Sequence, residues 1–203
     1  PGMHSSQNEQ DSRHYAIGAK VPMLEPADSQ ESYDFAKKAF ELSEKYDTPV
    51  LLRMCTRIAH SQSIVETGER NEVGVKKYEK NPAKYIMMPG NAKKRHPFVE
   101  ERTAKLTELA EDCEFNRIEY TDSKIGVITS GASYQYVKEA LGDSVSVYKL
   151  GLVNPLPVKS IKEFASKMDK VYVIEELDGI IESHCRNIGL DVTGKELFSC
   201  IGE

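Results

Sequence analysis

Residues 124–150, KIGVITSGASYQYVKEALGDSVSVYKL, contain two short apolar runs separated by an amphipathic stretch. Both runs, 125–129 and 145–150, have the length and apolar character of buried strands. The stretch between them repeats apolar residues at the spacing of one helix face, at Tyr134, Val137 and Leu141. Gly142 then provides a helix stop. This order predicts two parallel strands joined by a helix.

The same alternation continues toward the end of the chain. Pro157 can open a helix whose inward residues are Ile161, Phe164, Ala165 and Met168, and residues 171–174 form the next predicted strand. A last helix carries Ile181, His184, Cys185 and Ile188 on its apolar face. Because right-handed crossovers place helices on both faces of such a sheet, the pattern predicts a three-layer α/β/α fold with a mostly parallel sheet.

A second α/β unit is predicted before this one. Asp28 can cap a helix with Glu31 three residues later, and the apolar positions that follow are Phe35, Ala39, Leu42 and Tyr46. Residues 47–49 end that helix, and residues 50–55 are typical of a buried parallel strand. The stretch from about 61 to 120 is polar and irregular, with one helix opened by Pro97 and the apolar stripe Val99, Leu106, Leu109, Ala110 and Cys113.

Composition excludes several classes of function. The 27 basic and 32 acidic residues give a net charge of −5, so nucleic acid is not an expected partner, and the cluster 93–95 is interpreted as a solvated loop. The four cysteines lack C-x-x-C spacing, so we expect no metal site and a cytoplasmic, reducing location. No run of about 18 apolar residues is present, so no membrane span is expected. Both ends of the chain are interpreted as cut, because it begins at Pro1 and stops without a closing element.

A dense polar run occupies the N-terminus. His4, Glu9, Asp11, Arg13 and His14 bring acidic, basic and cationic side chains close together in the sequence. Such density is typical of a site that receives a charged substrate or partner. A hydrogen-bonded surface loop or dimer loop explains the same composition, and the spacing does not distinguish the two.

Two further positions follow predicted strands. Arg57 and His60 come just after the strand 50–55, at the end where α/β folds bind ligands, and arginine is suited to grip a carboxylate with two hydrogen bonds. A structural ion pair is the alternative for Arg57. His184 lies on an apolar helix face, which favours a hydrogen-bonded core histidine.

The turn after residues 125–129 is a weaker candidate. Ser130, Gly131 and Ser133 stand where a helix N-terminus can bind an anion, although Ser133 is also explained as a helix cap. Residues 142–144, Gly-Asp-Ser, are similar to the start of a diphosphate-binding and magnesium-binding motif, but they follow a helix and lack the later Asn. We interpret them as a helix-ending turn.

The run PGMHSSQNEQDSR at residues 1–13 closely resembles a segment of the alpha subunits of indolepyruvate:ferredoxin oxidoreductases, within the 2-oxoacid:ferredoxin oxidoreductase superfamily. Residues 49–60, 68–70 and 153–157 follow the same family in the same order. The resemblance implies the rear of a pyrimidine-binding-type domain at 1–65, an interdomain connection with one helix at 66–120, and a domain similar to the transketolase C-terminal domain at 121–203.

That family oxidatively decarboxylates arylpyruvates on thiamine diphosphate with Mg, forms an acyl-CoA and passes electrons through [4Fe-4S] clusters to ferredoxin. The resemblance therefore implies a beta subunit, ferredoxin, coenzyme A and arylpyruvate as partners, in an oligomer. The substrate-side candidates are His4, Ser5, Ser6, Gln7, Asn8, Glu9, Asp11, Arg13, Arg57 and His60. We expect no complete active site in this chain, because the cofactor motifs of the family are not in it. A non-catalytic assembly module and a relative acting on pyruvate or another 2-oxoacid are the alternatives.

Overall fold

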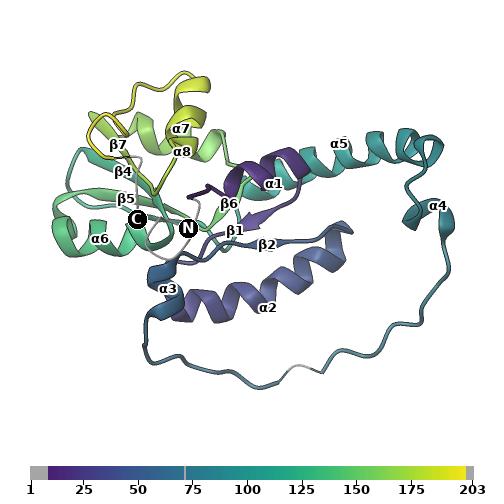
Figure 1. Cartoon of the computed structure of the whole chain (residues 1–203). Coiled ribbons are helices and arrows are strands. Elements are labelled where there is room, and N and C mark those ends of the chain that lie inside the picture. The colour runs from purple at the N-terminus through teal and green to yellow at the C-terminus, as the bar shows by residue number, and fades with distance from the viewer. Residues whose placement is uncertain (1–8, 71, 200–203) are drawn as a thin grey trace.

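The computed structural model describes residues 9–70 and 72–199 (Figure 1). The helices are α1 (Arg13–Ala19), α2 (Ser29–Tyr46), α3 (Thr56–His60), α4 (Pro82–Tyr85), α5 (Pro89–Glu111), α6 (Gly131–Leu141), α7 (Lys159–Ser166), α8 (Ile180–Asn187) and the 3₁₀ turn η1 (Gly142–Ser144). The strands are β1 (Met23–Leu24), β2 (Leu51–Leu52), β3 (Arg117–Glu119), β4 (Ile125–Ser130), β5 (Ser146–Leu150), β6 (Leu152–Asn154) and β7 (Lys170–Ile174). Among the described residues, no helix combines the length and the apolar character needed to span a bilayer.

The strands form two sheets. The larger sheet has the order β3-β5-β4-β7, in which β4 pairs in parallel with both β5 and β7 and only the edge strand β3 is antiparallel. The smaller sheet has the order β2-β1-β6, with β1 parallel to β2 and antiparallel to β6. The mostly parallel α/β sheet predicted from the alternation of strands and helices is confirmed.

One chain segment belongs to both sheets. Strand β5 ends at Leu150 in the larger sheet, and after Gly151 the chain continues as β6 in the smaller one. The side chain of Asn116 fixes this passage, because its Oδ1 accepts hydrogen bonds from the N–H groups of Gly151 and Leu152 at 2.8 and 3.0 Å. The carbonyl of Gly151 accepts from the N–H of Glu25 at 2.8 Å. The two sheets are therefore joined directly through the backbone.

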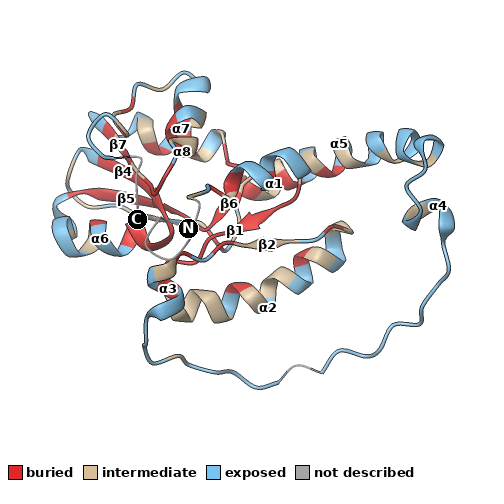
Figure 2. Cartoon of the chain, viewed as in Figure 1, coloured by how far each residue is buried: buried red, intermediate tan, exposed pale blue. Residues whose placement is uncertain are grey.

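Helices cover both faces of the larger sheet. On one face α6 packs Tyr134 and Val137 against Val127 and Val147. On the other face α7 and α8 contribute a second apolar layer, in which Phe164 of α7 is fully buried. The buried colouring in Figure 2 follows the strands and the inner faces of these helices. The three-layer arrangement predicted for this part of the chain is confirmed.

Helix α2 covers one face of the smaller sheet. Residues within the helix and at its two ends determine where it starts, where it stops and which side is apolar. Asp28 caps its N-terminus by accepting a hydrogen bond from the N–H of Glu31 at 2.8 Å, as predicted. Phe35 and Leu42 pack on Leu24 of β1, together with residues of α5 and β6. Asp47 ends the helix in the left-handed region, with φ 51°. Helix α1 packs Ala16 on Met23, within the core that α7 and α8 share.

Helix α5 links the two parts of the molecule. The carboxylate of Glu111, at its end, accepts hydrogen bonds from the N–H groups of Val158, Lys159 and Ser160, each at 2.9 Å. These groups belong to the first turn of α7, whose orphan N–H groups need partners. The hydrogen bonds from these amides hold the pKa of Glu111 below its usual range although burial acts to raise it. α7 therefore begins at Lys159, two residues after Pro157.

Several predicted boundaries are wrong. The strand expected at 50–55 is only Leu51–Leu52, because Arg53 turns into a charged cluster at the strand end. Helix α5 begins at Pro89, after an extended Met88, and so contains Pro97 inside it. Leu141 is 38% exposed because α6 ends there and Gly142 follows at φ 51°. The helix-ending turn predicted at 142–144 is confirmed as η1.

Candidate functional site

Polar side chains follow the carboxyl ends of four strands, two from each sheet. Glu25 follows β1, Arg53 follows β2, Ser130 is the last residue of β4, and Glu175 with Glu176 follows β7. These side chains meet between the sheets, together with the loop before α1. We call this group the strand-end cluster; its members are Asp11, Arg13, Glu25, Arg53, Ser130, Glu175 and Glu176, each at most 8% exposed.

Arg13 is the centre of the cluster and is 1% exposed. Its guanidinium donates hydrogen bonds of 2.6–3.1 Å to both carboxylate oxygens of Asp11. Nη1 donates to Glu175 at 2.5 Å, and Nη2 donates to the carbonyls of Glu176 and Asp178 at 2.7 and 2.8 Å. All three guanidinium nitrogens therefore have acceptors, and these hydrogen bonds and ion pairs compensate for the cost of removing the arginine from water.

Arg53 makes the second ion pair of the cluster. It is bonded closely to Glu25 and donates to Glu176 at 3.3 Å. Glu25 also accepts a hydrogen bond from the hydroxyl of Ser130 at 3.1 Å. Through these contacts β1 and β2 of the smaller sheet are tied to β4 and β7 of the larger one.

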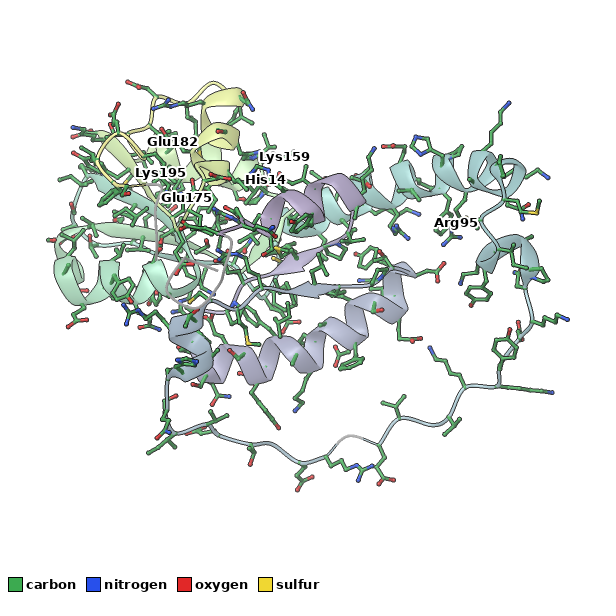
Figure 3. All side chains as sticks on the ribbon, in the orientation of Figure 1. His14, Arg95, Lys159, Glu175, Glu182 and Lys195 are labelled. Carbon is green, nitrogen blue, oxygen red and sulfur yellow. The ribbon has the colours of Figure 1, made fainter. Side chains whose placement is uncertain are left out.

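Glu175 connects the cluster to α8. Its carboxylate accepts hydrogen bonds from the N–H groups of Ile181 and Glu182, both at 2.9 Å, and so caps the helix. Lys195 donates to the carbonyl of Glu175 at 2.5 Å, and its own N–H donates to Glu182 at 2.8 Å. Figure 3 shows Glu175, Glu182 and Lys195 gathered at this end of the larger sheet, with His14 nearby on α1.

Burial and ion pairing shift the pKa values in the cluster. Burial acts to raise the pKa of Asp11, but the hydrogen bonds and charge of Arg13 outweigh it, so this pKa lies below its usual value. Burial raises the pKa of Glu175, and Arg13 with the two backbone amides offsets this only in part. The pKa values of Arg13 and Arg53 are raised, because their carboxylate neighbours outweigh burial. Folding therefore makes Glu175 easier to protonate and Asp11 harder to protonate.

The raised pKa of Glu175 predicts how stability depends on pH. Between the unfolded pKa near 4.5 and the higher folded pKa, the folded protein binds more protons than the unfolded chain. The contribution of Glu175 to stability is therefore complete at low pH and decreases as pH rises through this window, by at most about 1.4 kcal/mol per pH unit. The free energy of unfolding of the wild type relative to Glu175→Gln should fall as pH rises from 4.5, as measured by urea titration at several pH values. A difference that is flat or rises across this window would contradict the assignment.

Asp11 and Arg13 are the members of the predicted substrate side that lie in this cluster. Glu9 is half-buried just before it. His4, Ser5, Ser6, Gln7 and Asn8 lie outside the described residues. Because the Arg13 guanidinium is surrounded by acceptors from its own chain, the structure gives it an internal role that the sequence did not predict.

Arg57 and His60 lie on the exposed side of α3, immediately after Arg53 and Cys55. The inner side of α3 is fixed by a small apolar cluster in which Cys55 and Ile58 contact Ala132 of α6. The structure therefore brings α3 next to the start of α6 and the strand-end cluster. Their assignment to the substrate side stays a prediction.

The turn from β4 to α6 is closely approached by Glu25. A Cβ added at Gly131, where φ is +53°, would lie 2.5 Å from Oε1 of Glu25. A carboxylate in this position disfavours an anion at the start of α6, so Ser130 and Gly131 are poor anion ligands in this conformation. The prediction that Ser133 caps this helix is wrong, because the N-cap residue of α6 is Ser130 and Ser133 lies inside the helix. The side chain of Ser130 makes no capping hydrogen bond.

His184 and His14 line a cavity of about 650 Å³ between α1, α8 and the loop after β6. His184 is half-buried, and its Nε2 lies 2.9 Å from the carbonyl of Pro157, as expected for a hydrogen-bonded histidine. His14 lies at the rim, with Nε2 2.8 Å from the carboxylate of Asp178, and both side chains are more than half exposed. Across residues 9–70 and 72–199, no group of three His, Cys, Asp or Glu side chains is arranged to hold a metal ion.

Sequence reasoning missed Glu25, Arg53, Glu175 and Glu176 as a site. A signal was present, because Glu25, Arg53 and Glu175 each directly follow an apolar strand residue at the ligand-binding end of a parallel strand, and Glu176 is the next residue after Glu175. Arg57 was selected by the same argument, but Arg53 is the nearer residue to the strand end.

Two family models match the chain in tandem. Residues 1–120 match pyruvate flavodoxin/ferredoxin oxidoreductase, thiamine diphosphate-binding, and residues 117–197 match the indolepyruvate oxidoreductase domain. Indolepyruvate oxidoreductase subunit IorA of Archaeoglobus fulgidus is 41% identical over 201 residues, which are 96% of this chain and 32% of that protein. The Methanothermobacter marburgensis subunit is 43% identical over 95% of this chain and 33% of that protein, and the Thermococcus kodakarensis subunit is 39% identical over 100% and 34%. The chain thus spans about a third of the length of these relatives.

A solved structure shares the fold. The 2-oxoglutarate:ferredoxin oxidoreductase of Magnetococcus marinus, with 2-oxoglutarate, coenzyme A and succinyl-CoA bound, superposes with a TM-score of 0.67 and 17% identity over 96% of this chain and 42% of that one. This identity supports the fold alone. The resemblance carried by residues 1–13 is confirmed by the sequence comparisons, whose first family model covers more than half of the chain. The chain belongs to the thiamine diphosphate-binding pyruvate flavodoxin/ferredoxin oxidoreductase family, and it aligns with about a third of the indolepyruvate oxidoreductase subunits IorA.

Proposed function

We propose that this chain forms one wall of the substrate site in a cytoplasmic enzyme that oxidatively decarboxylates arylpyruvates, such as indolepyruvate, to acyl-CoA with ferredoxin as electron acceptor. The observation that carries the proposal is the tandem match of both family models to one chain whose strand ends converge between two sheets. The division at residues 65 and 120 into a pyrimidine-binding-type part, a connection and a transketolase-like part belongs to the same proposal.

The complete reaction needs groups that this chain does not supply alone. Thiamine diphosphate, when bound, supplies the carbanion chemistry that removes CO₂ from a 2-oxoacid. The diphosphate does not fit the start of α6, because the Glu25 carboxylate lies against Gly131 there. We place the binding sites of the diphosphate, of Mg and of the [4Fe-4S] clusters in other parts of the parent enzyme. A beta subunit, ferredoxin and coenzyme A are its proposed partners.

Within this wall, α3 is the element we assign to the substrate. The ion pairs of Arg53 and the contact of Ile58 with Ala132 hold α3 rigidly, while Arg57 and His60 project from its exposed side. A guanidinium there can bind the carboxylate of a 2-oxoacid, and the planar fork of arginine orients that carboxylate. The role of Arg57 is therefore binding and orientation of the substrate.

Arg57→Ala in the complete enzyme is expected to raise KM for the arylpyruvate about 10- to 100-fold, since a hydrogen bond to a charged group contributes about 1.5–3 kcal/mol. The measurement is arylpyruvate-dependent reduction of a dye acceptor over a range of substrate concentrations. Arg70→Ala is the matched control, because Arg70 is also an exposed arginine and its ion pair with Glu72 is exposed on both sides. An Arg57→Ala enzyme with unchanged KM and kcat would remove Arg57 from this role.

An assembly role for residues 121–203 is the second candidate. It is favoured by the strand-end cluster, whose charges are directed at one another and tie the two sheets together. Under this alternative, coenzyme A, nucleotides and thiamine diphosphate should leave the melting temperature of residues 121–203, expressed alone, unchanged. A saturable upward shift with any of them would exclude a purely structural role.

A further inference from the structure

A long segment between α3 and α4 lies apart from the body of the molecule. Residues 61–70 and 72–81, which we call the arm, contain no helix or strand, and Figure 1 shows this part of the chain running past α2 to α4. Figure 2 shows it exposed along nearly its whole length. Its large apolar side chains are nevertheless in water: Ile64 is 96% exposed, Val73 79%, Val75 102% and Tyr78 78%.

The contacts that attach the arm to α2 are polar and exposed. Gln30 bonds both backbone groups of Glu66, with the N–H of Glu66 donating at 2.8 Å and its carbonyl accepting at 3.3 Å. Lys76 pairs closely with Glu44, where both side chains are more than 60% exposed. Exposed pairs of this kind contribute little to stability. They offset little of the entropy lost in ordering some twenty residues, and they leave the apolar side chains of the arm uncovered.

A cavity of about 900 Å³ separates the arm from α2. Its apolar lining includes Tyr33, Phe40 and Val73, and Phe40 is itself 76% exposed. The charged residues that line it are Lys37, Glu41, Glu44, Glu69, Arg70 and Lys76, three acidic and three basic. A lining with both signs and no net charge does not repel its own copy.

The sequence of the arm is itself matched to a second copy running in the opposite direction. With Gly74 on a two-fold axis, Val73 lies opposite Val75 of the second copy, and Glu72 lies opposite Lys76 of the second copy. Alternate residues of an extended chain point to the same face, so the four valines gather on one side. Gly74 has no side chain, and a Cβ built on it has nothing within 4 Å, so two backbones can approach closely there.

The backbone of the arm is also available for pairing. Within the described chain, no N–H or C=O group of residues 72–80 takes part in a hydrogen bond. Valine favours extended strands, and an unpaired extended backbone is a template for another strand. We propose that the arms of two copies of this chain pair antiparallel about Gly74, and that this ribbon covers the apolar surface of Phe40 and Tyr33.

Cysteine cross-linking in the intact protein that carries this chain tests the arrangement. Val73→Cys protein and Val75→Cys protein, carrying different tags, are mixed and oxidised, and covalent species are separated by mass. We expect a disulfide-linked species containing both tags, at least tenfold more abundant than when Ile64→Cys replaces Val75→Cys, because residue 64 lies far from the proposed axis. Wild-type protein, whose native cysteines include the buried Cys55 and Cys185, provides the background.

A second measurement uses the affinity between copies. Val73→Asp places a carboxylate among the valines and should raise the dimer dissociation constant at least tenfold in sedimentation velocity, whereas Ile64→Asp should not. The proposal is overturned if the mixed cysteine proteins form no more cross-link than the Ile64→Cys control. It is equally overturned if Cys at position 73 or 75 cross-links within its own polypeptide or to a different subunit.

Discussion

Replacing Arg13 with methionine is expected to lower the free energy of unfolding by about 3–5 kcal/mol, because it leaves buried carboxylates without their counter-charge. Asp11 and Glu175 are each bonded to the guanidinium, and the side chains of both are 1% exposed. The carbonyls of Glu176 and Asp178 would also lose their donor. Methionine has a similar length and no charge, so the loss reports the electrostatic role of Arg13 rather than a large cavity. The measurement is urea-induced unfolding at pH 7.

Two further variants test whether the loss of stability comes from the buried ion pairs of Arg13 or from the removal of any arginine charge. Arg70→Met removes an arginine whose pair with Glu72 is more than 80% exposed on both sides, and it should leave the unfolding midpoint unchanged. Adding Glu175→Gln to Arg13→Met should recover part of the lost stability, because one uncompensated carboxylate is then neutral. If Arg13→Met is no more destabilising than Arg70→Met, the strand-end cluster does not hold the two sheets together.

The sequence of the N-terminal polar run did not reveal which residues Asp11 and Arg13 contact. Composition left two interpretations of Asp11 and Arg13 open, a site for a charged substrate or partner and a hydrogen-bonded surface or dimer loop, and the family resemblance placed both residues on the substrate side. The structure pairs Arg13 with Glu175, 162 residues away. No local pattern contains that pairing, because it depends on how the two sheets pack. The residue types were informative, but their partners were not visible in the sequence.

The layers of the fold were more predictable, because their signals are local. The cap at Asp28, the stop at Gly142 and the apolar spacing of Phe35 and Leu42 depend on neighbours within a few turns. The site was less predictable. The strand expected to end just before Arg57 stops at Leu52, so Arg53 and not Arg57 stands at the strand end. The approach of Glu25 to Gly131 was not visible, because Glu25 lies more than one hundred residues earlier in the chain.

The passage between the sheets was not predicted at all. Gly151 stands between a predicted strand and the segment 153–157, where a glycine is usually the mark of a turn. In the structure it lies where β5 becomes β6, and the carbonyl oxygen of Phe115 occupies the space that a Cβ at this position would need. The requirement at this position is space for a neighbouring backbone, and that requirement leaves no periodic pattern in the sequence.

Gly151→Ala is therefore expected to destabilise the protein by about 2–4 kcal/mol. The added Cβ would overlap the carbonyl oxygen of Phe115 and would lie 2.9 Å from the ring of Phe35. Both neighbours are fixed, because Phe115 and Phe35 are buried and their rings pack edge to face with centroids 5.0 Å apart. Relief requires moving the backbone that carries the bonds of Gly151 to Asn116 and Glu25. The measurement is the urea midpoint together with the slope of the transition.

Gly18→Ala is the matched control for this substitution. A Cβ at Gly18 meets nothing within 4 Å, and this glycine lies inside α1, so alanine there should leave stability unchanged or raise it by up to about 1 kcal/mol. The contrast between the two variants isolates the close approach of Phe115 from the general effect of adding a methyl group. Equal stability of both variants would show that the join between the sheets is free to move. The strand-end cluster would then have to hold them together alone, and Arg13→Met combined with Gly151→Ala would be no worse than Arg13→Met.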